Sequence, residues 1–298
     1  PLTMLALMPI LSEAGVPPGV VNVLPSRSSG AVVSKMLSDS RVRVVSFTGS
    51  TEVGRKLLHA AADNIVKPAM ELGGNAPFIV CQDADLNAAA DGLMVAKMRN
   101  LGEACTAANR IYVHENVATE FVDLFVAKMA NLKMGDGRDH SIDVGPLVNL
   151  ETRDKVDYFV RDAVSKGAVI KLGGQKPIGK GFFYPPTVIT NVPDTAECLY
   201  DEIFGPVAAI QTFSDEMEII QRSNATEYGL VAYVYTSDMK RGMRISESLE
   251  FGMIGLNRGL VSDPASPFGG VKQSGLGREG GKEGMLEFQE TQYISTEW

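Results

Sequence analysis

The sequence predicts an α/β protein in which helices cover the faces of a mainly parallel sheet. Short runs rich in β-branched residues alternate with amphipathic segments along the chain, which is typical of parallel strands joined by crossover helices. The first such unit is a strand expected at 42–47 followed by a helix that ends near residue 63. The length of 298 residues favours one large domain or two moderate ones.

The chain opens on a helix expected at 2–14, because apolar residues recur there at three-residue intervals and predict one packed face. A turn, a strand at 20–24 and a short helix at 31–37 are expected next. The remaining strands are expected at 68–72, 76–81, 111–113, 168–172, 186–192, 207–213, 231–236, 253–257 and 288–295, and the remaining helices at 85–98, 118–132, 151–166, 215–223, 240–248 and 279–287.

Composition excludes several classes of function. The net charge is −8, from 28 basic and 36 acidic residues without a basic run, which argues against binding to nucleic acid. No apolar stretch is long enough to span a bilayer and no charged-then-apolar leader is present, so we expect no membrane association and a cytoplasmic location. The three cysteines are widely separated and lack metal-ligand spacing, so a reducing compartment and no metal site are expected.

The strongest candidate nucleophile is Cys105. Small residues on both sides, in Gly-Glu-Ala-Cys-Thr-Ala, leave its sulfur open to an electrophile. The alternative is that Cys105 is a small buried apolar residue, the commonest fate of a free cysteine.

A thiol nucleophile needs a base, and the usual choice, histidine, is a poor candidate here. The chain has three histidines and none lies in a motif. Glu71 is the better candidate, because it ends a short apolar segment and precedes two glycines, Gly73 and Gly74, which allow close approach of the backbone.

A possible anion site follows the strand at 42–47. Thr48, Gly49 and Ser50 lead into the next helix, and a helix start with small residues leaves N–H groups free to face a pyrophosphate. The alternative is an ordinary Ser/Thr cap. The G-x-G-x-x-G fingerprint is absent.

Five motifs occur in the order and approximate spacing of the NAD(P)-dependent aldehyde dehydrogenases, which the chain therefore resembles over essentially its whole length. The motifs are FTGSTEVG, ELGGNAP, GEAC, EIFGP and PFGGVKQSGLGRE. The resemblance implies the final part of a Rossmann-type nucleotide-binding domain at 1–72, an α/β catalytic domain at 73–275, and a return segment with an oligomerisation strand at 276–298. Members of that family are longer at the N-terminus, so we expect a C-terminal piece of a longer chain.

The resemblance also implies a reaction and its residues. Cys105 would attack an aldehyde, hydride would pass to NAD or NADP, and Glu71 would activate the water that hydrolyses the thioester. Without the resemblance, Glu202 would be a surface loop charge and Phe204 a core anchor. The implied cofactor contacts are Thr48, Gly49, Ser50, Gly54, Leu72, Glu202 and Phe204.

Within the family, the chain looks closest to the succinate-semialdehyde dehydrogenases. Arg99 and Ser262 match positions that hold the substrate carboxylate in those enzymes, and a guanidinium suits that role. The alternative for Arg99 is a charge at a helix end. Asn75 gives mild support, since the wider family often has lysine there, and Ala107 excludes a disulfide switch beside the nucleophile. The family's terminal strand implies a homo-oligomer.

Three alternatives stay open at this point. The first is a dehydrogenase for another aldehyde, such as a medium-chain or amino aldehyde. The second is a catalytically silent fragment, and the third is a thiol esterase that needs no cofactor. The choice between NAD and NADP is not determined by the residues present.

Overall fold

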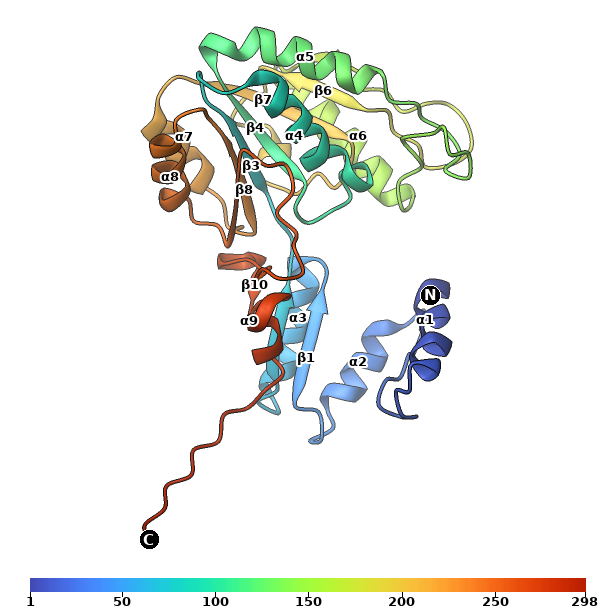
Figure 1. The fold of residues 1–298 in the computed structure, drawn as a ribbon. Helices are drawn as coiled ribbons and strands as arrows, with labels where there is room; N and C mark the ends of the chain where they lie inside the picture. The colour runs from blue at the N-terminus through green and yellow to red at the C-terminus, as the bar shows by residue number, and fades with distance from the viewer. The chain divides into compact units, whose positions relative to one another are not determined.

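A computed structural model describes all 298 residues, which form two compact units. The first unit contains 1–45 and 55–68, and the second contains 46–54 and 69–298 (Figure 1). None of the helices combines the length and the apolar character that crossing a bilayer requires.

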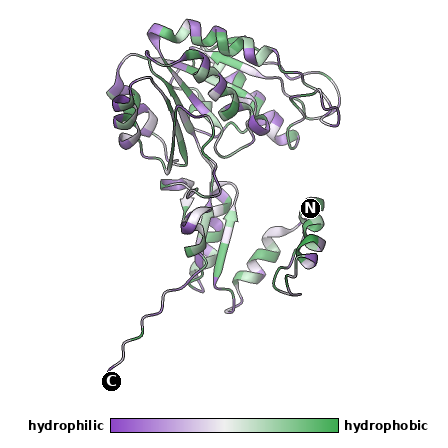
Figure 2. Ribbon diagram, in the orientation of Figure 1, coloured by the Kyte–Doolittle hydropathy of each residue, from purple (hydrophilic) through white to green (hydrophobic).

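The first unit is helical. It contains α1 (Leu2–Glu13), α2 (Ser29–Leu37) and most of α3 (Thr51–Ala62), with a small core around Leu37, Ala61 and Val66. The expected helix at the start of the chain is confirmed, but α1 buries none of its residues although it is largely apolar (Figure 2). The strand expected at 20–24 is wrong, because no neighbouring strand bonds to this segment and the chain there is irregular.

A small sheet contains β1 (Val44–Thr48), β2 (Lys67–Glu71) and β10 (Gly275–Leu276). β10 runs antiparallel to the end of β2 and places Gly275 opposite Glu71. The segment after residue 270 therefore returns to the residue that the sequence singles out as the base.

The second sheet has seven strands in the order β5-β6-β7-β4-β3-β8-β9, and only β5 is antiparallel to its neighbour. The expected parallel α/β architecture is confirmed. The strands are β3 (Ala76–Val80), β4 (Ala108–His114), β5 (Val169–Leu172), β6 (Thr187–Thr190), β7 (Val207–Phe213), β8 (Val231–Tyr235) and β9 (Met253–Leu256).

Helices cover both faces of this sheet (Figure 1). The side chains of β3 alternate between the two faces: Phe78 and Val80 pack against helices on one face and Ile79 against helices on the other. The first face carries α4 (Leu86–Met98) and α5 (Ala118–Ala130), and the second carries α6 (Leu150–Ser165), α7 (Glu216–Asn224) and α8 (Met239–Ser248). Short helices complete the chain: η1 (Arg99–Gly102), η2 (Glu115–Val117), η3 (Glu197–Leu199), η4 (Lys272–Ser274) and α9 (Gly281–Leu286).

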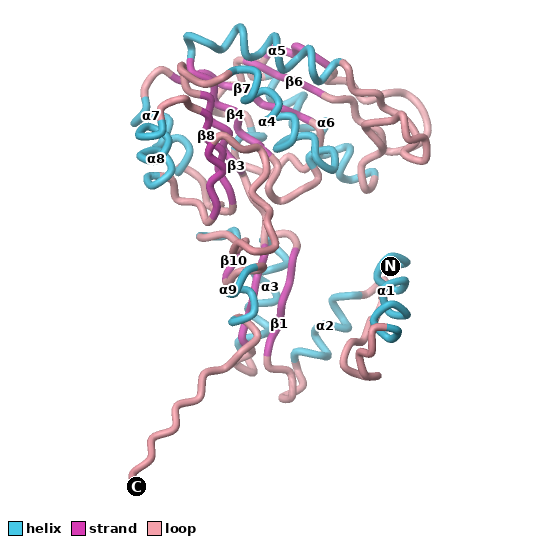
Figure 3. Tube along the Cα trace, in the orientation of Figure 1, coloured by secondary structure: helices cyan, strands magenta, loops and turns pink.

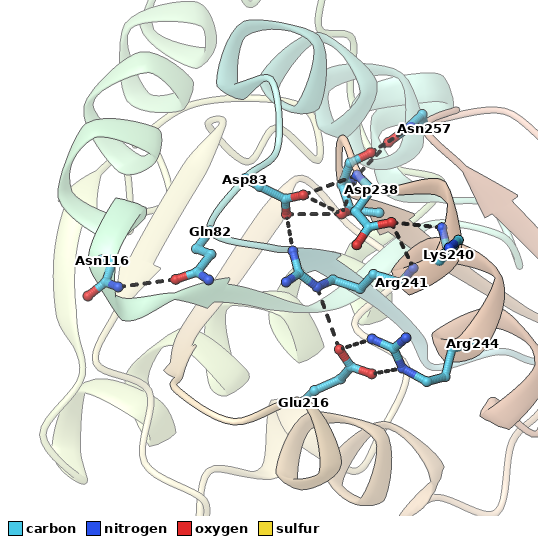
Figure 4. Close-up of polar contacts among 10 residues, drawn as sticks. Gln82, Asp83, Asn116, Glu216, Asp238, Lys240, Arg241, Arg244 and Asn257 are labelled. Carbon is cyan, nitrogen blue, oxygen red and sulfur yellow. Dashed lines mark hydrogen bonds and ion pairs between the residues drawn. The ribbon is translucent and has the colours of Figure 1, made fainter.

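A network of ion pairs lies at the carboxyl ends of β3 and β8 (Figure 4). Asp83 accepts a hydrogen bond from the Thr236 hydroxyl and pairs with Arg241 of α8 at 2.6 Å. Glu216 at the start of α7 pairs with Arg244 at 2.5 Å and with Arg241 at 3.6 Å. These contacts fasten α7 and α8 to the end of β3.

The segment after α9 has no regular structure (Figure 3). The strand expected at 288–295 is therefore not formed in the single chain, where Phe288, Tyr293 and Ile294 are exposed. A strand needs a partner for its N–H and C=O groups, and none lies beside this segment. Its pairing with a second copy stays a prediction.

Candidate active site

Three segments that lead into neighbouring strands carry the candidate residues. β3, β4 and β7 are adjacent and parallel, so the segments that precede them meet at one edge of the sheet. Glu71 precedes β3, Cys105 precedes β4, and Glu202 precedes β7. The topology thus gathers residues that are up to 131 positions apart (202 − 71).

Cys105 follows a sharp bend in the chain. Asn100 and Leu101 adopt left-handed backbone angles, with φ of 49° and 60°, and so end the helical segment before the nucleophile. The thiol is half-buried, and burial together with the carboxylates of Glu202 and Glu71 raises its pKa to about 11. Only the Arg99 guanidinium and a main-chain N–H oppose this shift. The thiol is therefore protonated at neutral pH.

Glu71 is the last residue of β2, and its carboxylate lies near enough to Cys105 to raise the pKa of that thiol. Its side chain is 5% exposed, and its Oε2 atom has no hydrogen-bond partner. Burial and the nearby Glu279 carboxylate raise its pKa to about 8, against an opposing effect of Arg278. A carboxylate of that pKa is a competent base near neutral pH.

Close backbone packing joins the two segments. A Cβ on Gly74 would lie 2.4 Å from the main-chain oxygen of Cys105, so only glycine fits there. The structure thus brings Glu71 and Cys105 to one site, as their electrostatic coupling also indicates.

Glu202 sits half-buried against the Gly73–Gly74 turn. The Gly74 N–H donates to Oε1 at 3.3 Å, and a Cβ on Gly73 would lie 3.3 Å from Oε2. Burial raises the pKa of Glu202 to about 7, although the Gly74 N–H, Lys155 and Lys97 oppose it. The absence of a side chain at Gly73 leaves space beside Oε2 of this carboxylate.

Phe204 follows Glu202 in a left-handed conformation with φ of 55°. Lys155 of α6 holds this turn, because its Nζ donates to the Glu202 main-chain oxygen at 3.2 Å and lies 6.0 Å from the centroid of the Phe204 ring. The half-buried ring is thus fixed at the edge of the site.

The segment from Thr48 to Gly54 contacts the same region. The Gly49 N–H donates to the Glu71 main-chain oxygen at 3.0 Å, and a Cβ on Gly54 would lie 2.5 Å from Leu72. Thr48, Gly49 and Ser50 are exposed at the start of α3. An exposed helix start beside a glycine cradle suits a phosphorylated dinucleotide.

The two expected substrate residues differ in placement. Arg99 donates from Nη2 to the Thr106 hydroxyl at 3.2 Å, which places its guanidinium beside the nucleophile. Ser262 is exposed in the loop after β9 and makes no hydrogen bond to Arg99 or Cys105. The structure therefore places Arg99 beside the nucleophile segment, and the substrate role of Ser262 stays a prediction.

A model of the aldehyde dehydrogenase family matches residues 1–294. The chain belongs to the aldehyde dehydrogenase family. Its motifs had indicated this membership, and the match confirms it.

Individual relatives match almost the whole of this chain. The chain is 52% identical to a succinate-semialdehyde dehydrogenase of Paenarthrobacter nicotinovorans, over 99% of this chain and 65% of the relative. It is 46% identical to a glutarate-semialdehyde dehydrogenase of Pseudomonas putida, over 99% and 61%. A crystal structure described as an NADP-dependent enzyme of E. coli matches with a TM-score of 0.94 at 44% identity, over 96% of this chain and 60% of that one. The chain thus spans about three fifths of the length of these aldehyde dehydrogenases.

Sequence reasoning missed one buried charge. Lys97, at the end of α4, is fully buried, and its Nζ atom has no hydrogen-bond partner. Burial lowers its pKa to about 7, and Glu202 is the main opposing influence. The sequence held a signal, since Lys97 lies four residues after Leu93 and so extends the apolar face of the helix.

Proposed function

We propose that the protein oxidises an aldehyde to a carboxylic acid with NAD or NADP, and that the preferred substrate is succinate semialdehyde. The observation that carries the proposal is the meeting of the Cys105 thiol, the Glu71 carboxyl group and Glu202 at one edge of the sheet. Family membership and the names of the relatives support it.

The residues have distinct roles in this proposal. Glu71 would take the proton of the Cys105 thiol as the sulfur attacks the carbonyl carbon, and the Cys105 main-chain N–H would donate to the resulting oxyanion. Loss of a hydride from the same carbon would leave a thioester on Cys105. Glu71, again without its proton, would then remove a proton from a water molecule whose oxygen attacks the thioester, which releases the acid and the thiol. When bound, NAD or NADP supplies the hydride acceptor.

Glu202 and the glycine turn would hold the cofactor. Glu202 would accept hydrogen bonds from ribose hydroxyls, because its Oε2 atom faces the space that Gly73 leaves. Gly49, Ser50, Gly54 and neighbouring residues at the start of α3 would face the phosphates.

Arg99 would select the substrate. Its guanidinium retains N–H groups beyond the bond to Thr106, and planar paired donors match a carboxylate. Hydrogen bonds to charged groups contribute about 1.5–3 kcal/mol, so a terminal carboxylate would raise kcat/KM by at least about 10-fold.

The test compares succinate semialdehyde with butanal, an uncharged aldehyde of equal length, using NAD⁺ and NADP⁺ in turn. We expect a preference of at least about 10-fold for the charged aldehyde that falls in Arg99→Met. Arg244→Met is the matched control, since Arg244 pairs with Glu216 at the opposite edge of the sheet. Equal efficiency with both aldehydes contradicts the substrate assignment. Ester hydrolysis by Cys105 that is unaffected by cofactor supports the esterase alternative.

Glutarate semialdehyde is the second candidate substrate. It carries the same terminal carboxylate on a chain longer by one methylene, and a relative at 46% identity bears its name. One methylene changes discrimination by about 1–3 kcal/mol, so the ratio of the two kcat/KM values separates the candidates.

A further inference from the structure

Two buried asparagines join the three loops of the site. Asn75, just after the glycine turn, is 1% exposed, and Asn109, four residues after Cys105, is 2% exposed. The Asn109 amide donates to Asn75 Oδ1 at 2.8 Å, so the two side chains form a direct bridge between the turn after Glu71 and the start of β4 after Cys105.

The same amides hold the third loop, which carries Glu202. Asn75 Nδ2 donates to the main-chain oxygens of residues 199 and 200 at 2.9 and 3.2 Å. Asn109 Nδ2 lies 3.1 Å from the main-chain oxygens of both Cys198 and Asp201, and its Oδ1 accepts from the Ile203 N–H at 3.0 Å. The residues on both sides of Glu202 are therefore bound to the two asparagines.

A buried guanidinium fixes this bridge to the rest of the domain. Arg110 is 2% exposed and donates to the Asn75 main-chain oxygen from Nε at 3.1 Å and from Nη2 at 2.9 Å. It also donates to the main-chain oxygens of Arg222 and Ser223 at the end of α7. Asn75 is thus held through both its main chain and its side chain.

Apart from the bond between the two side chains, the partners of these amides are main-chain groups of residues 198–203, in η3 and the loop that follows it. A bridge of this kind sets the separation of the loops, because each amide bond fixes a donor and an acceptor from different segments. Because these groups are buried, the loss of any one hydrogen bond costs free energy, and the distance between the loops is therefore well defined.

We infer that Asn75 and Asn109 are positioning residues that hold Glu202 at a fixed distance from Cys105, so that cofactor binding at Glu202 depends on the Asn75–Asn109 bridge. The inference rests on the proposed function, since it assigns Glu202 to the ribose of NAD or NADP. It predicts that a change at either asparagine weakens cofactor binding although neither side chain touches the cofactor.

The test uses Asn75→Asp and Asn109→Asp. Aspartate has nearly the same shape and keeps the acceptor oxygens but removes the N–H donors, so it faces the loop carbonyls with repulsion instead of hydrogen bonds. Asn224→Asp is the matched control, because the Asn224 amide also bridges two main-chain groups, in Ser248 and Glu250, and lies outside the proposed site. Asn75→Ser and Asn109→Ser replace any aspartate variant that does not fold.

Three quantities are measured: KM for NAD⁺ and NADP⁺, the rate of iodoacetamide alkylation of Cys105 with and without cofactor, and the thermal midpoint of unfolding. We expect the KM for cofactor to rise about 10-fold or more while the variants remain folded at the assay temperature, and cofactor to protect Cys105 less. Asn224→Asp should match the wild-type KM. Folded variants with unchanged KM and unchanged protection overturn the inference, because a purely structural role lowers only the midpoint.

The two proposals fail in different ways. If neither NAD⁺ nor NADP⁺ binds the wild-type protein, the proposed function fails. The positioning role is then decided by alkylation without cofactor. A several-fold change in the Cys105 rate in folded Asn109→Asp supports it, and an unchanged rate overturns it.

Discussion

Lys97 makes the stability of the protein depend on pH in a way that one substitution removes. Its side chain is fully buried without a hydrogen-bond partner, and burial lowers its pKa from 10.5 to about 7. Methionine has a similar length and no charge, so Lys97→Met keeps most of the packing and removes the titrating group.

The magnitude follows from proton linkage. Between pH 7 and pH 10.5 the unfolded chain holds a proton on Lys97 that the folded protein has released, so the free energy of unfolding rises with pH. One proton corresponds to about 1.4 kcal/mol per pH unit, which sums to about 5 kcal/mol across this window. Below pH 7 both states are protonated and the dependence vanishes. Lys97→Met lacks this rise altogether.

The assay is urea unfolding at pH 6.5, 7.5, 8.5 and 9.5 for wild-type protein, Lys97→Met and Lys171→Met. Lys171 is exposed on β5, so its loss should leave the slope of free energy against pH unchanged. The positive charge of Lys97 lowers the pKa of Glu202, so Lys97→Met also raises that pKa. This makes the free energy of unfolding rise less with pH, as the loss of the Lys97 proton itself does. If the free energy of unfolding changes equally with pH in wild-type protein and Lys97→Met from pH 7.5 to 9.5, the reasoning is wrong. Lys97 would then keep its proton in the folded protein.

Further predictions concern the nucleophile and the base. Cys105→Ser should lower kcat by at least about 10³-fold while cofactor still binds, as a fluorescence titration would show; substantial turnover would exclude Cys105 as the nucleophile. Glu71→Gln should lower turnover about 10²–10⁴-fold, yet at pH 9 iodoacetamide should alkylate Cys105 faster, because the Glu71 carboxylate raises the pKa of that thiol. Slower alkylation of Cys105 in Glu71→Gln would contradict the proximity of Glu71 and Cys105. In wild-type protein kcat should rise with pH as Glu71 loses its proton near pH 8. This rise should be absent in Glu71→Gln. Gly74→Ala should destabilise the fold by about 1–3 kcal/mol, measured by urea unfolding, because its Cβ would meet the Cys105 oxygen.

Sequence patterns predicted the large sheet well where burial alone shapes a strand. The strand expected at 207–213 matches β7, and those expected at 231–236 and 253–257 match β8 and β9 to within a residue. β4 begins three residues earlier than expected, at Ala108, because Asn109 and Arg110 are polar yet buried. Their hydrogen bonds go to main-chain oxygens about 90 and 110 residues away, in η3 and α7, which local sequence does not reveal.

The site was predictable to a different degree. Cys105 and Glu71 stood out through their motifs, and the structure places them at one edge of the sheet. Lys97 was missed because a lysine in an amphipathic helix normally marks the solvated face. Asn75 was noted only as a family marker, and its contacts with residues 199 and 200 depend on a loop that enters a different strand.

The position of the site within the sheet explains why hydrogen bonds between loops matter here. Ligands of open parallel sheets usually bind at the carboxyl ends of the strands, where helix starts converge. In this domain that edge carries the Asp83–Arg241–Glu216 ion pairs, whereas the candidate residues lie at the amino ends of β3, β4 and β7. Strand pairing and close backbone packing bring the segments before β3 and β4 together at that edge. The buried amides of Asn75 and Asn109 bind the segment before β7 to both of them.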